Sequence, residues 1–173
     1  MNNNCFIFRS LQEKDFEKFH CWMNDAEFLS FVIYTNNPDK NISNVTSETI
    51  SRKLFENYQK LHNYAVDIKG HGFIGMVGIK NMDKKNGDIY IFIGEKKLWG
   101  KGWGTKITKE FLNYCFENLK LNVIKCSVFG YNIRAIKMYE KLGFRQCGET
   151  IQAIWFDNKY WSMIYMELSK NFR

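Results

Sequence analysis

A strand that turns sharply into a helix constrains the fold of this 173-residue chain more than any other feature. The isoleucine-rich segment Asp88–Ile93 runs into a turn in which glycines occupy every second position, at Gly100, Gly102 and Gly104. After Thr105, apolar residues recur at helical spacing, at Ile107, Phe111, Tyr114 and Cys115. A strand, a tight turn and a helix in this order indicate an α/β architecture.

The glycine turn suits a phosphate group. Glycine lacks the Cβ atom that keeps a backbone away from a ligand, and the first amides of a helix are unpaired donors with a partial positive charge. Lys101, between two of the glycines, would add a full charge. The turn matches neither the P-loop nor the dinucleotide-binding fingerprint. Glycine at a strand-to-helix joint is also often turn chemistry alone, so both interpretations stay open.

A second segment, about thirty residues later in the chain, predicts a short helix with one buried stripe. Asn132 is typical of a helix N-cap, and Gly143 of a left-handed helix end. Between them, apolar residues follow the i, i+3, i+4, i+7 pattern, at Ala135, Met138, Tyr139 and Leu142. Tyr139 is therefore expected on the buried side, where its phenol needs a partner. A core tyrosine bonded to backbone would satisfy the same pattern.

Together the two segments, GEKKLWGKGWG at 94–104 and NIRAIKMYEKLGF at 132–144, resemble the GCN5-related N-acetyltransferases, and within them the ribosomal-protein alanine acetyltransferase-like branch. The resemblance extends over most of the chain, from a first helix containing Trp22 to a closing hairpin. It implies a single N-acetyltransferase domain over residues 1–173, with acetyl-CoA as the acetyl-donor cosubstrate. The amine acceptor would be a protein N-terminus or a small molecule such as an amino sugar or a polyamine.

In that family the turn holds the pyrophosphate of acetyl-CoA, and the preceding strand pairs with its pantetheine arm. Carried onto this sequence, the acyl-donor contacts fall on Ile91, Phe92, Ile93, Trp99, Gly100, Lys101, Gly102, Trp103, Gly104, Thr105 and Asn132. Trp99 departs from the family, which often has Arg or Gln at that position. The resemblance further implies that strand amides at Ile91–Gly94 stabilise the oxyanion and that Tyr139 protonates the departing thiolate.

The base that deprotonates the amine is less defined. Asp88 stands where many relatives carry an acidic residue, although a strand-end charge after Asn86-Gly87 explains it equally well. Glu95 is a second candidate, in a lysine-rich loop typical of a solvated charge, and water-relayed deprotonation needs no dedicated base. No metal site is expected, because the five cysteines and three histidines show no ligand spacing.

The net charge of +7 favours a cosubstrate with several phosphates and, at the acceptor, an anionic group over a polycation. The cations are scattered, which disfavours a basic nucleic-acid-binding protein. A non-catalytic acyl-CoA-binding module is the other alternative, although such a module would be free to replace Tyr139. Unpatterned cysteines, without a signal peptide or a membrane-length apolar run, predict a cytoplasmic protein. A homodimer is expected by analogy with the branch.

The whole pattern predicts a mixed, mostly antiparallel sheet of six to seven strands flanked by about four helices, in the α/β (α+β) class. The expected strands are Cys5–Arg9, Tyr64–Ile68, Gly72–Ile79, Asp88–Ile93, Asn122–Phe129, Gln146–Trp155 and Lys159–Leu168. Three further helices are expected besides the two above: Glu13–Met23, Asp25–Phe31, and a stretch from Thr46 or Ser47 to Lys60. The last of these is expected to have Ile50 on its buried face. The Asn-rich segment Tyr34–Ser47 is expected to be a mobile acceptor lid or plain disorder.

Overall fold

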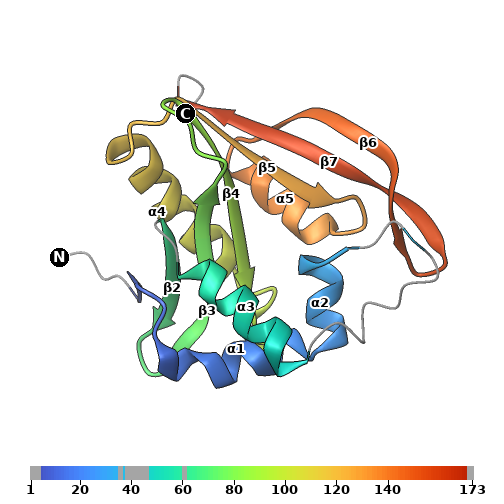
Figure 1. Cartoon of the computed structure of the whole chain (residues 1–173). Helices are drawn as coiled ribbons and strands as arrows, with labels where there is room; N and C mark the ends of the chain where they lie inside the picture. The colour runs from blue at the N-terminus through green and yellow to red at the C-terminus, as the bar shows by residue number, and fades with distance from the viewer. Residues whose placement is uncertain (1–4, 35–36, 38–46, 60–61, 171–173) are drawn as a thin grey trace.

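Seven strands form one mixed sheet in the order β1-β2-β3-β4-β5-β7-β6 (Figure 1). The computed structural model describes residues 5–34, 37, 47–59 and 62–170. The strands are β1 (Phe6–Arg9), β2 (Asn63–Ile68), β3 (Gly72–Lys80), β4 (Asn86–Ile93), β5 (Val123–Phe129), β6 (Arg145–Phe156) and β7 (Lys159–Ser169). The α-helices are α1 (Phe16–Met23), α2 (Ala26–Val32), α3 (Glu48–Tyr58), α4 (Trp103–Glu117) and α5 (Ile133–Lys141), with short 3-10 turns η1 (Glu13–Asp15) and η3 (Lys96–Leu98). The predicted fold class is confirmed.

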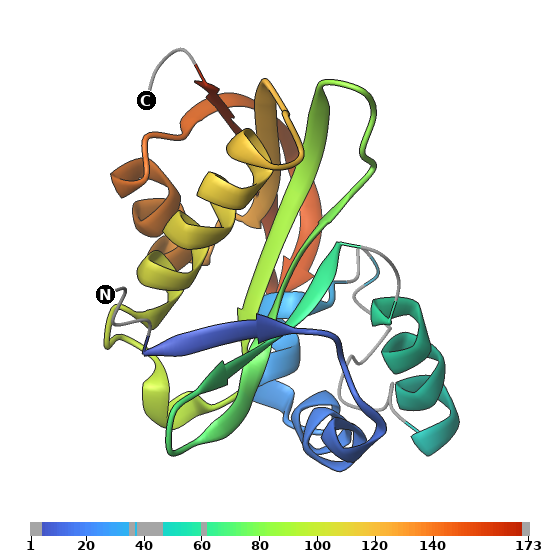
Figure 2. The same cartoon turned by 90° about the vertical axis from the view of Figure 1, so that its left-hand side faces the viewer.

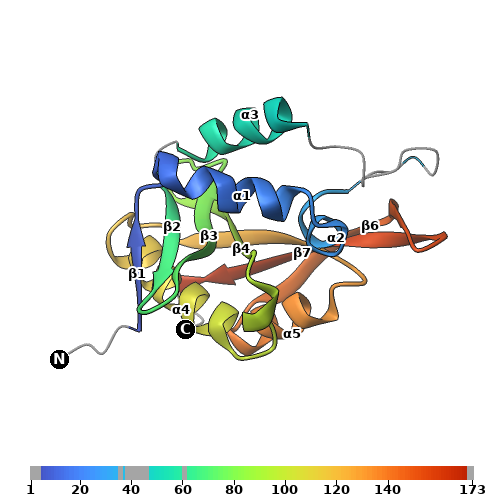
Figure 3. The same cartoon turned by 90° about the horizontal axis from the view of Figure 1, so that it is seen from below.

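Helices cover both faces of the sheet, with α1, α2 and α3 on one side and α4 and α5 on the other (Figure 3). The larger core lies under α4 and α5 and includes Ile107 and Phe111 of α4 packed against Ile89 of β4. The second core lies under α1 to α3 and contains Phe19, Phe55 and other aromatic side chains. Each central strand therefore needs apolar residues on both faces, as the nearly continuous buried run of β3 shows.

The pairing between β4 and β5 is short. All other neighbouring strands pair antiparallel, but β4 and β5 run parallel and pair only at Asn86–Val123, Gly87–Ile124 and Asp88–Lys125. Beyond Asp88 the two strands diverge (Figure 1). From there β4 stays paired with β3 as far as Ile93, whereas β5 pairs with β7. Beyond Asp88 the sheet therefore divides into two parts, β1 to β4 and β5 to β7. The gap between them faces the glycine turn.

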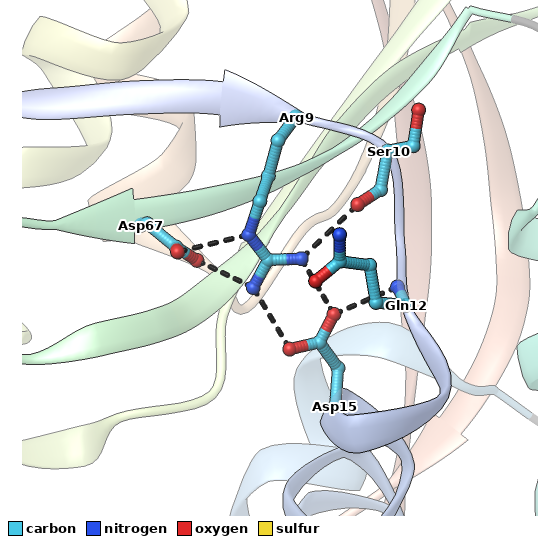
Figure 4. A network of polar contacts seen from close by, with 5 residues as sticks. All are labelled: Arg9, Ser10, Gln12, Asp15 and Asp67. Atoms are coloured by element: carbon cyan, nitrogen blue, oxygen red, sulfur yellow. Dashed lines mark hydrogen bonds and ion pairs between the residues drawn. The ribbon is translucent and has the colours of Figure 1, made fainter.

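Arg9 fixes the start of α1 to the edge of the sheet, where β1 faces the viewer in Figure 2. Its guanidinium donates to Asp67 of β2 at 2.8 and 2.9 Å and to Asp15 at 2.6 and 2.8 Å (Figure 4). Asp15 also accepts a hydrogen bond from the Gln12 amide at 2.8 Å, and the hydrogen bonds to Asp15 raise the pKa of Arg9 above its ordinary value. Because Asp15 is only 3% exposed, removing Arg9 would leave a buried carboxylate without its cation.

Most boundaries match the sequence-based expectation, and three differ for local reasons. The helices number five among the described residues, against an overall expectation of about four; the separate ranges expected for α1 and α2 are confirmed, because Asn24 ends α1 and the Asp25 side chain caps α2. β4 starts at Asn86 rather than Asp88, because Asp83 closes a shorter turn by accepting from the amides of Lys85 and Asn86.

The third difference concerns one residue of α3, Ile50, which was expected on the buried face with Leu54, Phe55 and Tyr58; these other three do contribute to the core. Ser51 and Phe55 are buried, whereas Ile50 is 40% exposed. Of the two residues at which this helix was expected to begin, Thr46 or Ser47, Ser47 is the N-cap, because its hydroxyl accepts from the Ile50 amide. The predicted lid over the acceptor site falls mainly on residues 35–36 and 38–46, which lie outside the described residues.

Candidate active site

A cavity of about 470 Å³ opens where β4 and β5 part. Its walls come from α2, the end of β4, the glycine turn, the start of α4, and α5. Of the eleven residues expected to hold an acyl donor, all line this cavity except Lys101. Residues far apart in the sequence, such as Phe31, Ile91 and Asn132, therefore meet around one space.

The turn before α4 leaves room for an anion against its backbone. Gly100 and Gly102 have φ of +73° and +81°, the left-handed region that only glycine adopts freely, and a Cβ on either would meet no atom within 4 Å. Gly102 is the N-cap of α4 and offers no side chain to the first helical amides. These amides and the positive end of the helix dipole thus face the cavity without a side-chain cap, an arrangement that fits a phosphate group.

The separated end of β4 offers backbone donors to the same cavity. The Gly94 amide donates to the Ile74 carbonyl of β3 at 2.9 Å, so Gly94 and, by antiparallel alternation, Phe92 direct their amides toward β3. Ile91 and Ile93 then direct theirs toward the side that β5 has left. Gly94 is therefore not a free oxyanion donor, and Ile91 and Ile93 are the residues of the expected range that point to the gap.

Trp99 makes contacts that the sequence did not define. Its indole N–H donates to the Ile93 carbonyl at 2.7 Å, which supplies a partner on the side where β5 is missing. The face of the indole lies 4.8 Å from the guanidinium carbon of Arg134, and the ring of Phe31 lies 5.3 Å from the same carbon. The position that often carries Arg or Gln in the resembling family thus carries a ring on which an arginine of α5 rests.

Three cations on α5 line the cavity and were missed by the sequence analysis. Arg134, Lys137 and Lys141 stand at i, i+3 and i+7, so they follow one face of the helix. The spacing was visible in the sequence, but the same spacing is common on solvated helix faces. Together with Asn132, whose side chain caps α5 by accepting from the Ala135 amide at 3.2 Å, they give α5 a polar edge toward the cavity.

Tyr139 lies in the core beside the cavity and not among the residues that line it. It is 4% exposed, and its ring packs against Phe144 at 5.0 Å between centroids. Burial, and next the neighbouring Cys126, raises the pKa of the phenol well above its ordinary value of 10. The phenol therefore stays protonated throughout the neutral range. Its neighbours on α5, Ala135 and Met138, do line the cavity.

Asp88 lies at the point where β4 and β5 separate, about 10 Å along the strand before Ile91. Its carboxylate accepts a hydrogen bond from Asn81 at 2.7 Å, and Asp88 does not line the cavity. It also belongs to a row of alternating charges across five paired strands: Lys80, Asp88, Lys125, Glu167 and Arg145. Asp88 therefore has opposite charges as its cross-strand neighbours on both sides. Glu95, the second candidate base, forms an ion pair with Lys18 at 2.7 Å.

The wall on the α2 side is apolar. Phe28, Phe31 and Val32 line it. The two carboxylates of this helix region point elsewhere, since Lys96 pairs with Asp25 at 2.6 Å and with Glu27 at 3.1 Å. Among the described residues, no His, Cys, Asp or Glu cluster is arranged to hold a metal ion, and no helix is both long and apolar enough to cross a membrane.

Comparisons with known proteins agree with this geometry. Residues 6–145 match the family model described as acetyltransferase (GNAT) domain. The chain is 34% identical over 88 residues to a probable spermine N(1)-acetyltransferase of Bacillus subtilis subsp. natto, a match that covers 50% of this chain and 58% of that relative. It is 25% identical over 174 residues to a putative ribosomal N-acetyltransferase, YdaF, of Bacillus subtilis, covering 97% of this chain and 93% of the relative.

A solved structure of similar fold is the spermidine N-acetyltransferase of Vibrio cholerae in complex with CoA and spermine. It aligns over 98% of both chains with a TM-score of 0.79 and 19% sequence identity. At this identity the likeness concerns the fold.

Proposed function

The chain belongs to the acetyltransferase (GNAT) family, and from this premise we propose that it transfers the acetyl group of acetyl-CoA to a primary amine. The observation that carries the proposal is the cavity where β4 and β5 separate. It joins an uncapped, glycine-rich helix start to strand amides that have lost their neighbouring strand. A phosphate-bearing thioester needs both features, one for its charge and one for its carbonyl oxygen.

In this proposal acetyl-CoA is a substrate that lies between the two parts of the sheet. The amides at Trp103 to Thr105 receive its diphosphate, and the backbone of Ile91–Ile93 pairs with its pantetheine arm as a short extra strand would. Asn132 has the amide group to bond that arm while it caps α5. Lys101, which does not line the cavity, contributes only through its charge.

The chemical step is a direct attack of the amine on the thioester carbonyl. A C–N bond forms, the C–S bond breaks, and the sulfur leaves as a thiolate that takes a proton. The amides of Ile91 and Ile93 stabilise the negative charge that develops on the carbonyl oxygen. Tyr139, still protonated at neutral pH, is the proposed proton donor to the thiolate. The amine loses its proton to Asp88 or to water.

The acceptor class is the finer part of the proposal. The names of several relatives specify spermine or spermidine, and a polyamine is one candidate. The α2 side of the described cavity wall is apolar, and the wall has no carboxylate to bind a polycation, which favours an amine carried on an apolar molecule. A protein N-terminus is a member of this second class, and the similarity to the putative ribosomal N-acetyltransferase along its length supports it.

The test is calorimetric titration with acetyl-CoA, followed by a thiol-release assay on the same sample against polyamines, amino sugars and peptides. Gly102→Glu is the binding control, because it places a carboxylate and a strained left-handed residue where the diphosphate is expected, without a clash to unfold the protein. We expect the control to weaken binding by about 100-fold or more.

The outcomes separate the alternatives. Binding with thiol release for one acceptor class supports the enzyme and identifies its substrate. Binding without release for any acceptor favours a non-catalytic acyl-CoA-binding module, in line with the position of Tyr139 behind the cavity wall. Absence of binding by the unmodified protein overturns the proposal. Sedimentation velocity on the same sample tests the expected homodimer.

A further inference from the structure

We propose that Arg134 recognises the diphosphate of the acyl donor and that Phe31 and Trp99 are positioning residues that hold its guanidinium. This inference rests on the proposed function and adds a specific side-chain contact to it. The starting observation is a guanidinium in the wall of the cavity that lies 5.3 and 4.8 Å from the centroids of two aromatic rings, which themselves meet edge to face at 5.8 Å.

The charge around Arg134 is unbalanced. No ion pair to Arg134 is found in the described part of the chain, and the described cavity lining contains Arg134, Lys137 and Lys141 but no acidic residue. The start of α4, which opens onto the same cavity, adds the positive end of a helix dipole. Like charges gathered around one space repel each other. An anion in this space removes the repulsion, and a diphosphate carries the charge to match.

The two rings explain why Arg134 is assigned this contact ahead of the two lysines. A guanidinium is planar and binds phosphate oxygens in a bidentate way, and stacking on aromatic faces reduces the rotamer freedom that it must lose on binding. Trp99 is itself fixed by its hydrogen bond to the Ile93 carbonyl. It also directly precedes Gly100, the first glycine of the turn that faces the diphosphate. Arg134 is therefore held beside this turn.

The lysines lie farther along α5. At 1.5 Å per residue, Lys137 and Lys141 stand about 4.5 and 10 Å beyond Arg134 on the helix axis, away from Trp99. Met138, next to Lys137, lies close to Gly104 at the start of α4. What sets the lysines apart from Arg134 is therefore the aromatic contact, which neither lysine makes in the described part of the chain, and they are assigned to another part of the ligand. The inference thus separates the phosphates of the donor: the diphosphate contacts Arg134, and the removal of the 3′-phosphate leaves that contact unchanged.

Calorimetry with coenzyme A, dephospho-coenzyme A and pantetheine tests this assignment. These ligands carry a diphosphate with a 3′-phosphate, a diphosphate alone, and no phosphate. Arg134→Gln is expected to lower the affinity for coenzyme A and for dephospho-coenzyme A by the same factor, about 10- to 100-fold, and to leave the affinity for pantetheine unchanged. Lys97→Gln is the matched control: it removes one positive charge from an exposed lysine near the turn that does not line the cavity. Its effect should stay within about twofold.

The positioning role of Phe31 is tested by a double-mutant cycle. Phe31→Leu as a single substitution should lower the affinity for coenzyme A by about 3- to 10-fold. The same substitution should have no effect in the Arg134→Gln background and none on pantetheine in either background. A merely structural role for the ring would weaken all three ligands in both backgrounds. Arg134→Lys keeps the charge but not the planar group, so its affinity for coenzyme A should fall between those of the unmodified protein and the Arg134→Gln variant.

Three results would overturn the inference while leaving the proposed function in place. The first is that Arg134→Gln binds coenzyme A as tightly as the unmodified protein does. The second is that it lowers the affinity for pantetheine as much as that for coenzyme A. The third is that it does not lower the affinity for dephospho-coenzyme A. The last result would assign Arg134 to the 3′-phosphate. If the unmodified protein binds none of the three ligands, the proposed function itself fails.

Discussion

The two ends of strand β4 are built differently. At its start, Asn86–Asp88 pairs with β5 through the backbone, whereas Ile89–Ile93 pairs with β3 alone. At the separated end, side chains take over the connection. The Trp99 indole binds the Ile93 carbonyl, Lys96 ties the turn after β4 to the start of α2, and the ring of Trp22 packs closely over Gly94.

The difference shows how a sheet can open without losing its shape. A backbone ladder holds two strands at a fixed distance of about 4.8 Å, which leaves no room for a ligand. Side-chain contacts hold the same elements from the outside and leave backbone donors free between them. The chemistry of this molecule is therefore expected at the end of β4 where the ladder stops.

The largest effect should follow from adding a methyl group at the separated end. A Cβ on Gly94 would lie 1.9 Å from Cδ2 of the Trp22 ring, and the ring is buried and cannot move aside freely. We expect Gly94→Ala to lower the free energy of unfolding by about 3 kcal/mol, measured by urea denaturation.

Gly87→Ala, at the paired end of the same strand, is the control. There the new methyl would meet Cδ1 and Cγ1 of Ile79 at 2.6 and 2.8 Å, and this aliphatic side chain, although buried, can change rotamer more easily than an indole ring. A cost of about 1 kcal/mol is expected. If the two substitutions cost the same, the contact between Trp22 and Gly94 does not hold the separated end.

Local patterns were enough to predict most elements, including the turn, α5 with its Asn132 cap, and the left-handed Gly143, for which φ is +94°. The separation of β4 from β5 is of another kind. Ile89, Ile91 and Ile93 alternate as residues of any central strand do, and whether a neighbouring strand is present depends on residues more than thirty positions away. It entered the sequence analysis only through the family resemblance.

The same limit applies to the cations of α5. Arg134 reads as a solvated charge in the sequence, and only the fold brings the adjoining rings of Phe31 and Trp99 against its guanidinium. For Ile50 the error is the opposite one, because a residue expected to be buried is exposed. It was assigned to the core because it is apolar, yet the small polar Ser51 occupies the crowded position between α3 and its neighbours. Side-chain size and packing, which periodicity does not carry, decide that choice.

A second, intermediate effect tests at which end of β4 the proton transfers occur. Tyr139→Phe removes only the hydroxyl of a buried ring, so we expect kcat to fall by about 10- to 100-fold with the affinity for acetyl-CoA unchanged. Asp88→Asn should reduce kcat by less than about threefold if Asp88 serves the row of alternating charges and water carries the amine proton.

Both variants need a thiol-release assay over a range of pH with the acceptor found in the panel. A Tyr139→Phe variant that retains full kcat would remove Tyr139 as the proton donor. A fall of more than about 100-fold in Asp88→Asn, restored at high pH where the amine is already neutral, would instead identify Asp88 as the base.

The smallest effect concerns the ion pair that ties α2 to the separated end. The hydrogen bond from Lys96, and next that from the Phe28 amide, lowers the pKa of Asp25 below its ordinary value of 3.8. A lowered pKa in the folded state means that Asp25 contributes stability above pH 3.8, and that this contribution is lost as the pH falls through the folded value. Because Asp25 is partly exposed, we expect Asp25→Ala to cost only about 0.5 to 1 kcal/mol at pH 7.

This cost should shrink as the pH falls through the folded pKa of Asp25, when urea denaturation of Asp25→Ala and the unmodified protein is compared at pH 7 and at a series of pH values below 3.8. Asp25→Asn keeps a side-chain cap for the Phe28 amide but not the charge, so its cost at pH 7 should be smaller than that of Asp25→Ala. Both costs should shrink by the same amount as the pH falls, because the change with pH comes from Asp25 of the unmodified protein. An Asp25→Ala cost that stays the same over the whole pH series would show that the cap alone, and not the ion pair with Lys96, holds α2 beside the open end of β4.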